Sequence, residues 1–203
     1  MMPLHFIHIG KCGGMTIRKE ISKSKKWTIS DLTHLKPAKY VQDSVRGNYL
    51  IAIRDPIDRF ISAFNWAVKH NEKHPNDYGD AEIVSKYKTP NALAEKLYTE
   101  DGELDEAVVA EAKKIHHIGE DINFYLEAFL KVCPRESIVG VIHLEAIEKD
   151  MAAVLGIKIT MHTHKNKDMD TDLSASGRQN LQKFLHKDYE CVAKLEELVK
   201  GKK

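Results

Sequence analysis

The feature that most constrains the fold is a glycine-rich loop between an apolar stretch and a helical pattern near the start of the chain. Residues 3–9 (PLHFIHI) are expected to form a short buried strand, and residues 15–21 a helix. Gly10, Gly13 and Gly14 lie between them. A strand, a tight glycine turn and a helix form the opening of a βα unit, which predicts a parallel sheet.

Such a loop exposes backbone N–H groups at the positive end of the helix dipole, and it is therefore a ready anion-binding site. Lys11 adds a mobile positive charge, and Thr16 adds a hydroxyl donor. The order of glycines and lysine differs from the Walker pattern, which disfavours a simple ATP or GTP hydrolase. Taken alone, the loop is also compatible with an ordinary glycine turn that carries a surface lysine.

A second apolar strand is expected at residues 49–53 (YLIAI), followed by Arg54 and a helix. Asp55 and Pro56 are a favourable helix start, with Asp as the N-cap and Pro at the first helical position. Apolar residues then recur at helical spacing and predict a buried stripe made of Ile57, Phe60, Ile61, Phe64 and Val68. Polar side chains are expected on the other face of this helix, namely Asp58, Arg59, Ser62, Asn65 and Lys69.

The rest of the chain alternates predicted helices with further strands, of which a short one is expected at residues 27–30. A third central strand is expected at residues 137–142, and residues 70–88 are expected to form a long surface loop. Strands that alternate with helices predict the α/β class. We therefore expect a single domain over residues 1–203, with a mostly parallel central sheet flanked by helices on both faces.

Composition excludes several classes of protein. The chain has 203 residues and a formal net charge of +1, so its overall charge gives no indication of nucleic acid or an anionic membrane as a partner. No apolar run approaches the roughly 20 residues that span a bilayer, and no secretory signal is evident. The three cysteines lack metal-ligand spacing and suggest a reducing compartment. We expect a cytoplasmic location, whereas no pattern reveals the oligomeric state.

The glycine loop resembles a known family. HFIHIGKCGGMTI (residues 5–17) is similar to the 5′-phosphosulfate-binding loop of sulfotransferases that use 3′-phosphoadenosine 5′-phosphosulfate (PAPS), and it is closer to their carbohydrate-modifying and bacterial branch. The resemblance implies that Lys11 contacts the bridging oxygen and the sulfuryl group. It also implies a cofactor-binding segment made of Lys11, Cys12, Gly13, Gly14, Met15 and Thr16. Since the family usually has threonine or serine where Met15 stands, one side-chain contact to phosphate is expected to be missing.

A second motif resembles the 3′-phosphate-binding motif of the same family. In IAIRDPIDRFISAFNW (residues 51–66), Arg54 stands at a strand end and Ser62 follows eight positions later, as in that motif. A 3′-phosphate distinguishes PAPS from ATP, and an arginine fork with a hydroxyl is a natural clamp for it. Because both motifs occur in the right order after predicted strands, the chain is identified as a member of this family, with a P-loop-NTPase-like fold.

Attack by a hydroxyl on sulfur needs a base near neutral pH, and histidine suits that role. His34 is our candidate because it lies in a polar loop between the two motifs, where carbohydrate sulfotransferases carry a catalytic histidine. A local capping or packing role for His34 is equally compatible, and Asp31 is the reserve base. His116 and His117 precede a predicted helix and are further candidates to face the acceptor.

The expected function is transfer of a sulfuryl group from PAPS to a hydroxyl or amine, with release of 3′-phosphoadenosine 5′-phosphate (PAP). The acceptor class implied is a carbohydrate or small metabolite, and no segment identifies it. No carboxylate pair for magnesium is evident, so we expect chemistry without a metal. Two alternatives stay open: a P-loop-type kinase of a small molecule, and a catalytically silent PAP-binding or scaffold protein.

Overall fold

The computed structural model describes most of the chain, namely residues 3–31, 47–75, 77–160 and 170–201. The chain forms two compact units, which are treated separately below. The first comprises residues 1–54, 122–165 and 189–203, and the second comprises residues 55–121 and 166–188. The assignment of residues 1–203 to one domain stays a prediction.

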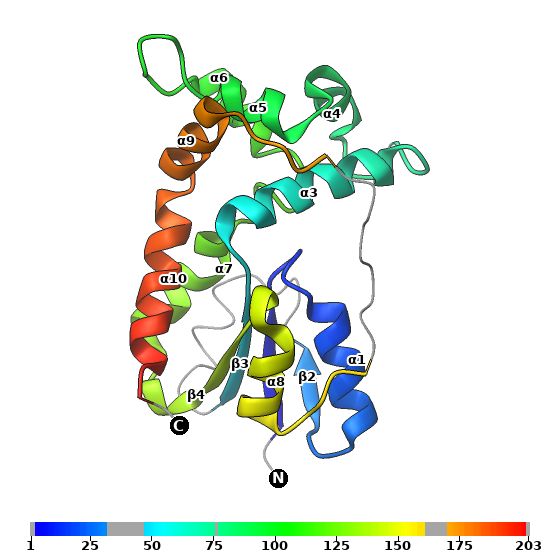
Figure 1. Ribbon diagram of the computed structural model, residues 1–203, viewed down its shortest axis with the longest axis vertical. Helices are drawn as coiled ribbons and strands as arrows, with labels where there is room; N and C mark the ends of the chain where they lie inside the picture. Colours follow the sequence, from blue (N-terminus) through cyan, green and yellow to red (C-terminus); the bar gives the residue numbers. More distant parts are fainter. Residues whose placement is uncertain (1–2, 32–46, 76, 161–169, 202–203) are drawn as a thin grey trace. The chain divides into compact units, whose positions relative to one another are not determined.

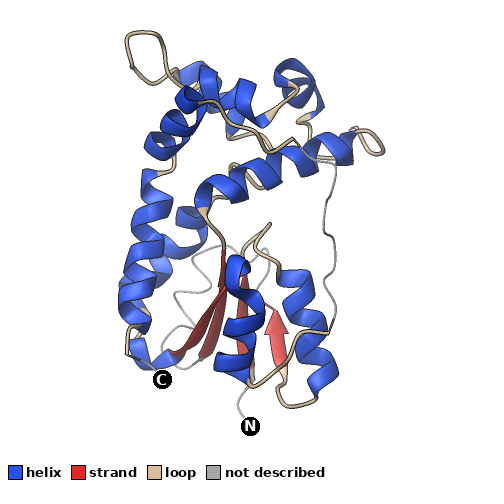
Figure 2. Cartoon of the chain, viewed as in Figure 1, coloured by secondary structure: helices blue, strands red, loops and turns tan. Residues whose placement is uncertain are grey.

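The first unit is built on a four-stranded sheet in which all neighbouring strands are parallel (Figures 1 and 2). Its strands, in the order β2-β1-β3-β4, are β1 (Leu4–His8), β2 (Ile29–Asp31), β3 (Asn48–Ile53) and β4 (Ile138–His143). The sequences NYLIAI and IVGVIH alternate little, because parallel strands are covered on both faces. The predicted α/β class with a parallel sheet is confirmed.

Helices cover this sheet. On one face lie α1 (Gly14–Ser24) and α8 (Ile147–Leu155), and on the other lies α7 (Ile122–Val132) (Figure 1). Packed beside α7 is α10 (His186–Val199), where the Cys191 thiol reaches the Asn123 side chain at 3.4 Å. Each of these helices contributes buried apolar side chains to one core with the strands, and this burial is the main stabilising term.

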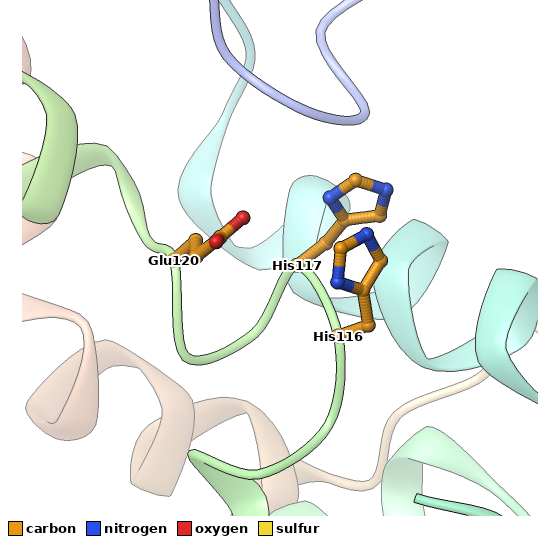
Figure 3. Close-up of side chains that lie close together, drawn as sticks. All are labelled: His116, His117 and Glu120. Atoms are coloured by element: carbon orange, nitrogen blue, oxygen red, sulfur yellow. The ribbon is translucent and has the colours of Figure 1, made fainter. Parts of the chain in front are cut away.

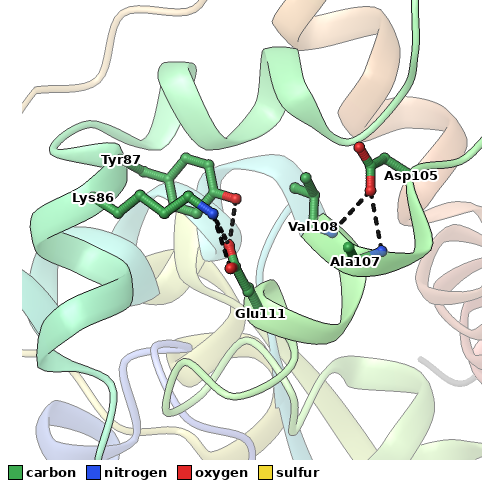
Figure 4. Close-up of polar contacts among 6 residues, drawn as sticks. All are labelled: Lys86, Tyr87, Asp105, Ala107, Val108 and Glu111. Atoms are coloured by element: carbon green, nitrogen blue, oxygen red, sulfur yellow. Dashed lines mark hydrogen bonds and ion pairs between the residues drawn. The ribbon is translucent and has the colours of Figure 1, made fainter.

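The second unit is helical and contains α3 (Pro56–Asn71), α4 (Ala81–Tyr87), α5 (Pro90–Lys96), α6 (Glu106–Ala112) and α9 (Ala175–Phe184). The predicted cap of α3 is present, because the Asp55 carboxylate accepts a hydrogen bond from the Asp58 backbone N–H at 3.0 Å. Asp105 caps α6 in the same way, through the N–H groups of Ala107 and Val108 (Figure 4). Side-chain caps therefore fix where these helices begin.

The expectation of a surface loop over residues 70–88 is wrong in part. Helix α3 continues to Asn71, and residues 81–87 form α4, on which Val84 and Tyr87 are buried. Lys86 and Tyr87 both donate hydrogen bonds to the Glu111 carboxylate of α6 (Figure 4). A helix of this length carries too few apolar positions to show a period, so its tertiary partners decide its structure.

Two residues of the expected polar face of α3 are in fact buried. Arg59 is only 2% exposed and Asn65 is 8% exposed. Arg59 donates to the Glu120 carbonyl at 2.5 Å, and the Asn65 amide donates to the Asp170 carbonyl at 2.7 Å. Other segments of the same unit cover this face, and their backbone carbonyls supply the hydrogen bonds that burial of polar groups requires.

Two short 3-10 turns complete the described elements: η2 (Arg135–Ser137) precedes β4, and η3 (Leu144–Ala146) follows it. Within the described ranges, no helix is both long enough and apolar enough to cross a bilayer.

Candidate active site

The predicted glycine loop leads from β1 into α1. Lys11 and Gly13 both adopt the left-handed conformation, with φ of 68° and 77°. Cys12 between them is fully buried, and its backbone N–H donates to the Ile9 carbonyl at 3.3 Å. The loop therefore turns sharply at its base, while the Lys11 side chain is only half-buried. Left-handed backbone at a non-glycine residue is unfavourable, so the surrounding structure holds Lys11 in place.

The first turn of α1 presents backbone donors. Gly13 is the N-cap, and it provides no side chain to cap the helix. The N–H of Thr16 donates to the Gly13 carbonyl at 3.0 Å. Gly14 and Met15 are the first two residues of α1, and backbone N–H groups at these positions have no carbonyl acceptor within the helix. They lie at the positive end of the helix dipole. This arrangement can bind an anion.

Two glycines of the loop are required by close packing. A Cβ at position 14 would lie 1.9 Å from Cδ2 of His8, and a Cβ at position 13 would lie 2.6 Å from Cδ1 of Leu144. The loop thus lies between the end of β1 and the start of the segment that leads into α8. A larger residue would therefore require Leu144 or His8 to shift, and at position 13 it would also adopt an unfavourable positive φ.

Arg54 lies at the same edge of the sheet as the loop. Strands β1 and β3 are parallel neighbours, with His8 opposite Ala52. Gly10 and Arg54 each follow this pair by two residues, so both leave the sheet at its carboxyl edge, where open α/β sheets bind their ligands. Arg54 is half-buried. The register of adjacent strands therefore places Gly10 of the first motif and Arg54 of the second at the same edge of the sheet.

The comparison with known families agrees with this geometry. Residues 6–101 match the model of the sulfotransferase family. Over these residues, slightly less than half of the chain, the sequence is similar to the sulfotransferase family. The matched region contains both motifs, the glycine loop and the segment from Arg54 to Ser62. No curated protein matches the chain significantly.

The structure gives less information on the other candidate residues. Ser62 lies on α3 in the second unit and is half-buried. Met15 is 57% exposed, and its thioether stands where the family usually has a hydroxyl. Thr16 is 6% exposed, so its hydroxyl lies within the first turn of α1. His34, the candidate base, lies outside the described residues, and the reserve Asp31 is the last residue of β2.

The other candidates to face the acceptor lie in the second unit. His116 and His117 follow α6 in a turn that also contains Glu120 (Figure 3). They are thus away from the glycine loop in the chain and belong to a different compact unit. Their part in the transfer reaction stays untested.

Sequence reasoning missed a charged cluster at the end of β4. The imidazole of His143 is 2.7 Å from the Asp150 carboxylate through Nδ1 and 2.5 Å from the Glu196 carboxylate through Nε2. Burial alone would lower the pKa of His143, but the hydrogen bonds to Asp150 and Glu196 outweigh it and raise that pKa. The one local sign of this cluster in the sequence is a histidine at the end of an apolar strand. The partner Glu196 is 53 residues away, so no short-range pattern predicts the contact.

His143 lies close to the candidate site along the sheet. It is opposite Ile53 in the β3–β4 register, and Ile53 directly precedes Arg54. The cluster is therefore at the same carboxyl edge, one strand beyond Arg54. Its bonds tie β4 to α8 and α10, so its effect is to hold this edge of the first unit together.

Proposed function

We propose that this protein, whose residues 6–101 match the sulfotransferase family model, transfers a sulfuryl group from PAPS to an acceptor hydroxyl or amine and releases PAP. The observation that carries the proposal is the parallel register of β1 and β3. It puts the anion-binding loop and Arg54 at one edge of the sheet, two residues beyond the same pair. A donor with phosphates at both the 5′ and the 3′ position needs two such positive sites side by side.

The residues at this edge fit the two ends of PAPS. The N–H of Cys12 donates to the Ile9 carbonyl, and the N–H of Thr16 donates to the Gly13 carbonyl. Between these two amides in the chain lie the N–H groups of Gly13, Gly14 and Met15. These three N–H groups suit the 5′-phosphosulfate, with Lys11 beside them. Arg54 suits the 3′-phosphate, because its guanidinium can donate two parallel hydrogen bonds to one phosphate. The hydroxyl of Ser62 is the second proposed ligand of the 3′-phosphate.

The chain's own residues supply positioning and electrostatics. PAPS supplies the sulfuryl group. As the acceptor oxygen forms a bond to sulfur, the bond between sulfur and the oxygen of the 5′-phosphate breaks. His34 takes the proton of the acceptor hydroxyl, and Asp31 is the reserve for this step. The electron pair of the breaking sulfur–oxygen bond stays on the phosphate of PAP. Lys11 and the loop N–H groups stabilise that negative charge as it develops.

The acceptor is proposed to be a carbohydrate or a small metabolite. The support is the likeness of the glycine loop to the carbohydrate-modifying branch of the family. The chemistry requires only that a hydroxyl or amine reach the sulfur in line with the leaving oxygen, with its proton within reach of the base.

Transfer of labelled sulfur from PAPS tests the proposal. The full chain is incubated with ³⁵S-labelled PAPS and a panel of mono- and oligosaccharides and small hydroxylated metabolites, and labelled product and PAP are measured together. We expect both to form in equal amounts with at least one acceptor, and slow release of labelled sulfate without one. Tight PAP binding with neither product nor sulfate would show a silent binding protein. Phosphate transfer from ATP to the same panel would show a kinase.

A further inference from the structure

A second cluster of reactive side chains lies in the turn between α6 and α7, within the second unit. His116, His117 and Glu120 each offer one ligand atom, and these atoms all lie within 4.8 Å of one another (Figure 3). All three residues are half-buried. We propose that they bind a divalent transition-metal ion, with Zn²⁺ as the best match. The argument for this site does not rest on the proposed sulfuryl transfer.

The backbone of the turn makes the cluster possible. Side chains of consecutive residues ordinarily point apart, but His117 has a φ of 70°. In this left-handed conformation the two imidazoles come to the same side, with ring centroids 4.0 Å apart (Figure 3). A non-glycine residue in this region costs on the order of 1–3 kcal/mol, and such residues gather at functional sites and ligand clamps.

Two buried charged residues hold the turn at its ends. Asp80, which is fully buried, accepts a hydrogen bond from the His116 backbone N–H at 3.0 Å. The same carboxylate also accepts from the Asn71 amide at 2.7 Å. At the other end, the buried Arg59 donates to the Glu120 carbonyl. These bonds to backbone groups therefore fix the positions of the first and last proposed ligands.

A tight turn between these anchors brings Glu120 back toward the histidines. A Cβ at position 119 would lie 2.0 Å from the Lys113 carbonyl oxygen, so only glycine fits there. The aromatic rings of Trp66 and Tyr78 form one wall of the cluster. Trp66 lies 5.3 Å from the ring of His116 and 5.0 Å from that of His117, and Tyr78 stacks on His116 at 4.0 Å.

Two imidazoles and one carboxylate are a ligand set that selects borderline transition metals rather than Mg²⁺ or Ca²⁺. Zinc sites with three protein ligands leave the fourth position open to water. Bond lengths of about 2.0–2.2 Å place tetrahedral ligand atoms roughly 3.3 Å apart. The present spacing therefore needs only side-chain rotations to close around an ion, because the backbone is already anchored. The aromatic rings pack against both imidazoles and help to hold them in this turn.

Direct Zn²⁺ titration tests the site. The full chain is stripped with EDTA and titrated with Zn²⁺ in competition with a chromophoric chelator. We expect one equivalent to bind, and Glu120→Gln and His117→Asn to weaken that binding by at least about tenfold. Asparagine tolerates the left-handed conformation at position 117, and glutamine keeps the shape of Glu120. His74→Gln is the control near the cluster, and His186→Gln is the control on α10.

Trp66 gives a second, local readout. The sequence has two tryptophans, so Trp27→Phe leaves Trp66 as the only indole. We expect Ni²⁺ or Cu²⁺ to quench its fluorescence in the Trp27→Phe protein and far less after adding Glu120→Gln. Circular dichroism establishes that each variant is folded, and His116→Gln replaces any variant that is not. Equal Zn²⁺ affinity in the ligand variants and in both controls, or no stoichiometric binding, would overturn the proposal.

Discussion

Gly14 at the start of α1 lies directly against the imidazole of His8 at the end of β1, so that a Cβ at position 14 would lie 1.9 Å from His8 Cδ2. The first residue of the helix thus packs directly on the side chain of the last residue of the strand. This contact sets the position of the first N–H groups of α1 above the carboxyl edge of the sheet. The geometry of the proposed phosphosulfate loop therefore depends on the absence of a side chain at position 14.

Gly14→Ala is expected to displace either His8 or the start of α1. Gly14 does not have a positive φ, so alanine would be tolerated there but for the clash. We expect a loss of about 1–3 kcal/mol of unfolding free energy, typical of overpacking, and a smaller PAP-induced rise in Tm. Urea unfolding and thermal melts with and without PAP measure both effects.

The double variant Gly14→Ala/His8→Ala separates the clash from other causes. Removing the imidazole makes room for the new methyl group, so the double variant should be more stable than the sum of the two single changes predicts. Strict additivity of the two stability changes would show that His8 is not what excludes a side chain at position 14.

The local parts of the fold were predictable from sequence. The strand, glycine loop and helix at residues 3–24 follow from an apolar run, three glycines and a helical period, all of which act over short distances. The start of α3 follows from Asp55 and Pro56 for the same reason. That β1 and β3 are neighbours, which places Arg54 at the same edge as the loop, was not predicted, because strand order depends on contacts between distant segments.

The remaining features depend on partners far away in the sequence. The sequence pattern assigns Arg59 to the polar face of α3. Its burial is explained by the hydrogen bond that it donates to the carbonyl of Glu120, 61 residues later. The same is true of His143, whose partner Glu196 lies on α10. The cluster at His116 depends on a left-handed residue and on a distant Asp80, which no periodic pattern reveals. His34 lies outside the described residues, and its role rests on the family resemblance.

The raised pKa of His143 makes part of the stability pH-dependent. A group whose pKa is raised in the folded state stabilises it fully below its unfolded pKa of about 6.5, and this contribution is lost as pH rises through the folded value. Tm measured from pH 5.5 to pH 9 should therefore fall more steeply for the native chain than for His143→Gln. Parallel curves over this range would show that the bonds to Asp150 and Glu196 do not depend on protonation of the imidazole.

Lys11 is expected to matter more to turnover than to PAP affinity, because the charge that it stabilises develops on the leaving phosphate. Lys11→Ala should lower turnover by roughly 10²–10³-fold, typical of one preorganised electrostatic contact. Alanine and lysine share the same unfavourable left-handed conformation, so the change isolates the charge. Single-turnover kinetics and PAP titration measure the two quantities, with the exposed Lys19→Ala as control. Normal turnover with much weaker PAP binding would contradict this role.

If His34 is the base, it must be neutral to accept a proton. Turnover should then fall on the acid side with an apparent pKa of about 6–7, and His34→Gln should lower it by about 10²–10⁴-fold with little change in PAP affinity. A pH–rate profile with a working acceptor measures this, and slow hydrolysis of PAPS serves as an interim readout. Near-normal turnover of His34→Gln with an unchanged acid limb would move the assignment to Asp31, His116 or His117.

Discrimination between PAP and ADP tests the central claim most directly, because only PAP carries the 3′-phosphate assigned to Arg54 and Ser62. We expect PAP to raise Tm well above the effect of ADP at equal concentration, and Arg54→Ala to remove most of that difference. A lost charge-assisted bond of about 1.5–3 kcal/mol corresponds to roughly 10–150-fold in PAP affinity. The exposed Arg178→Ala on α9 is the matched control and should retain the full difference. Equal Tm shifts from PAP and ADP in the native chain would contradict the proposed use of PAPS.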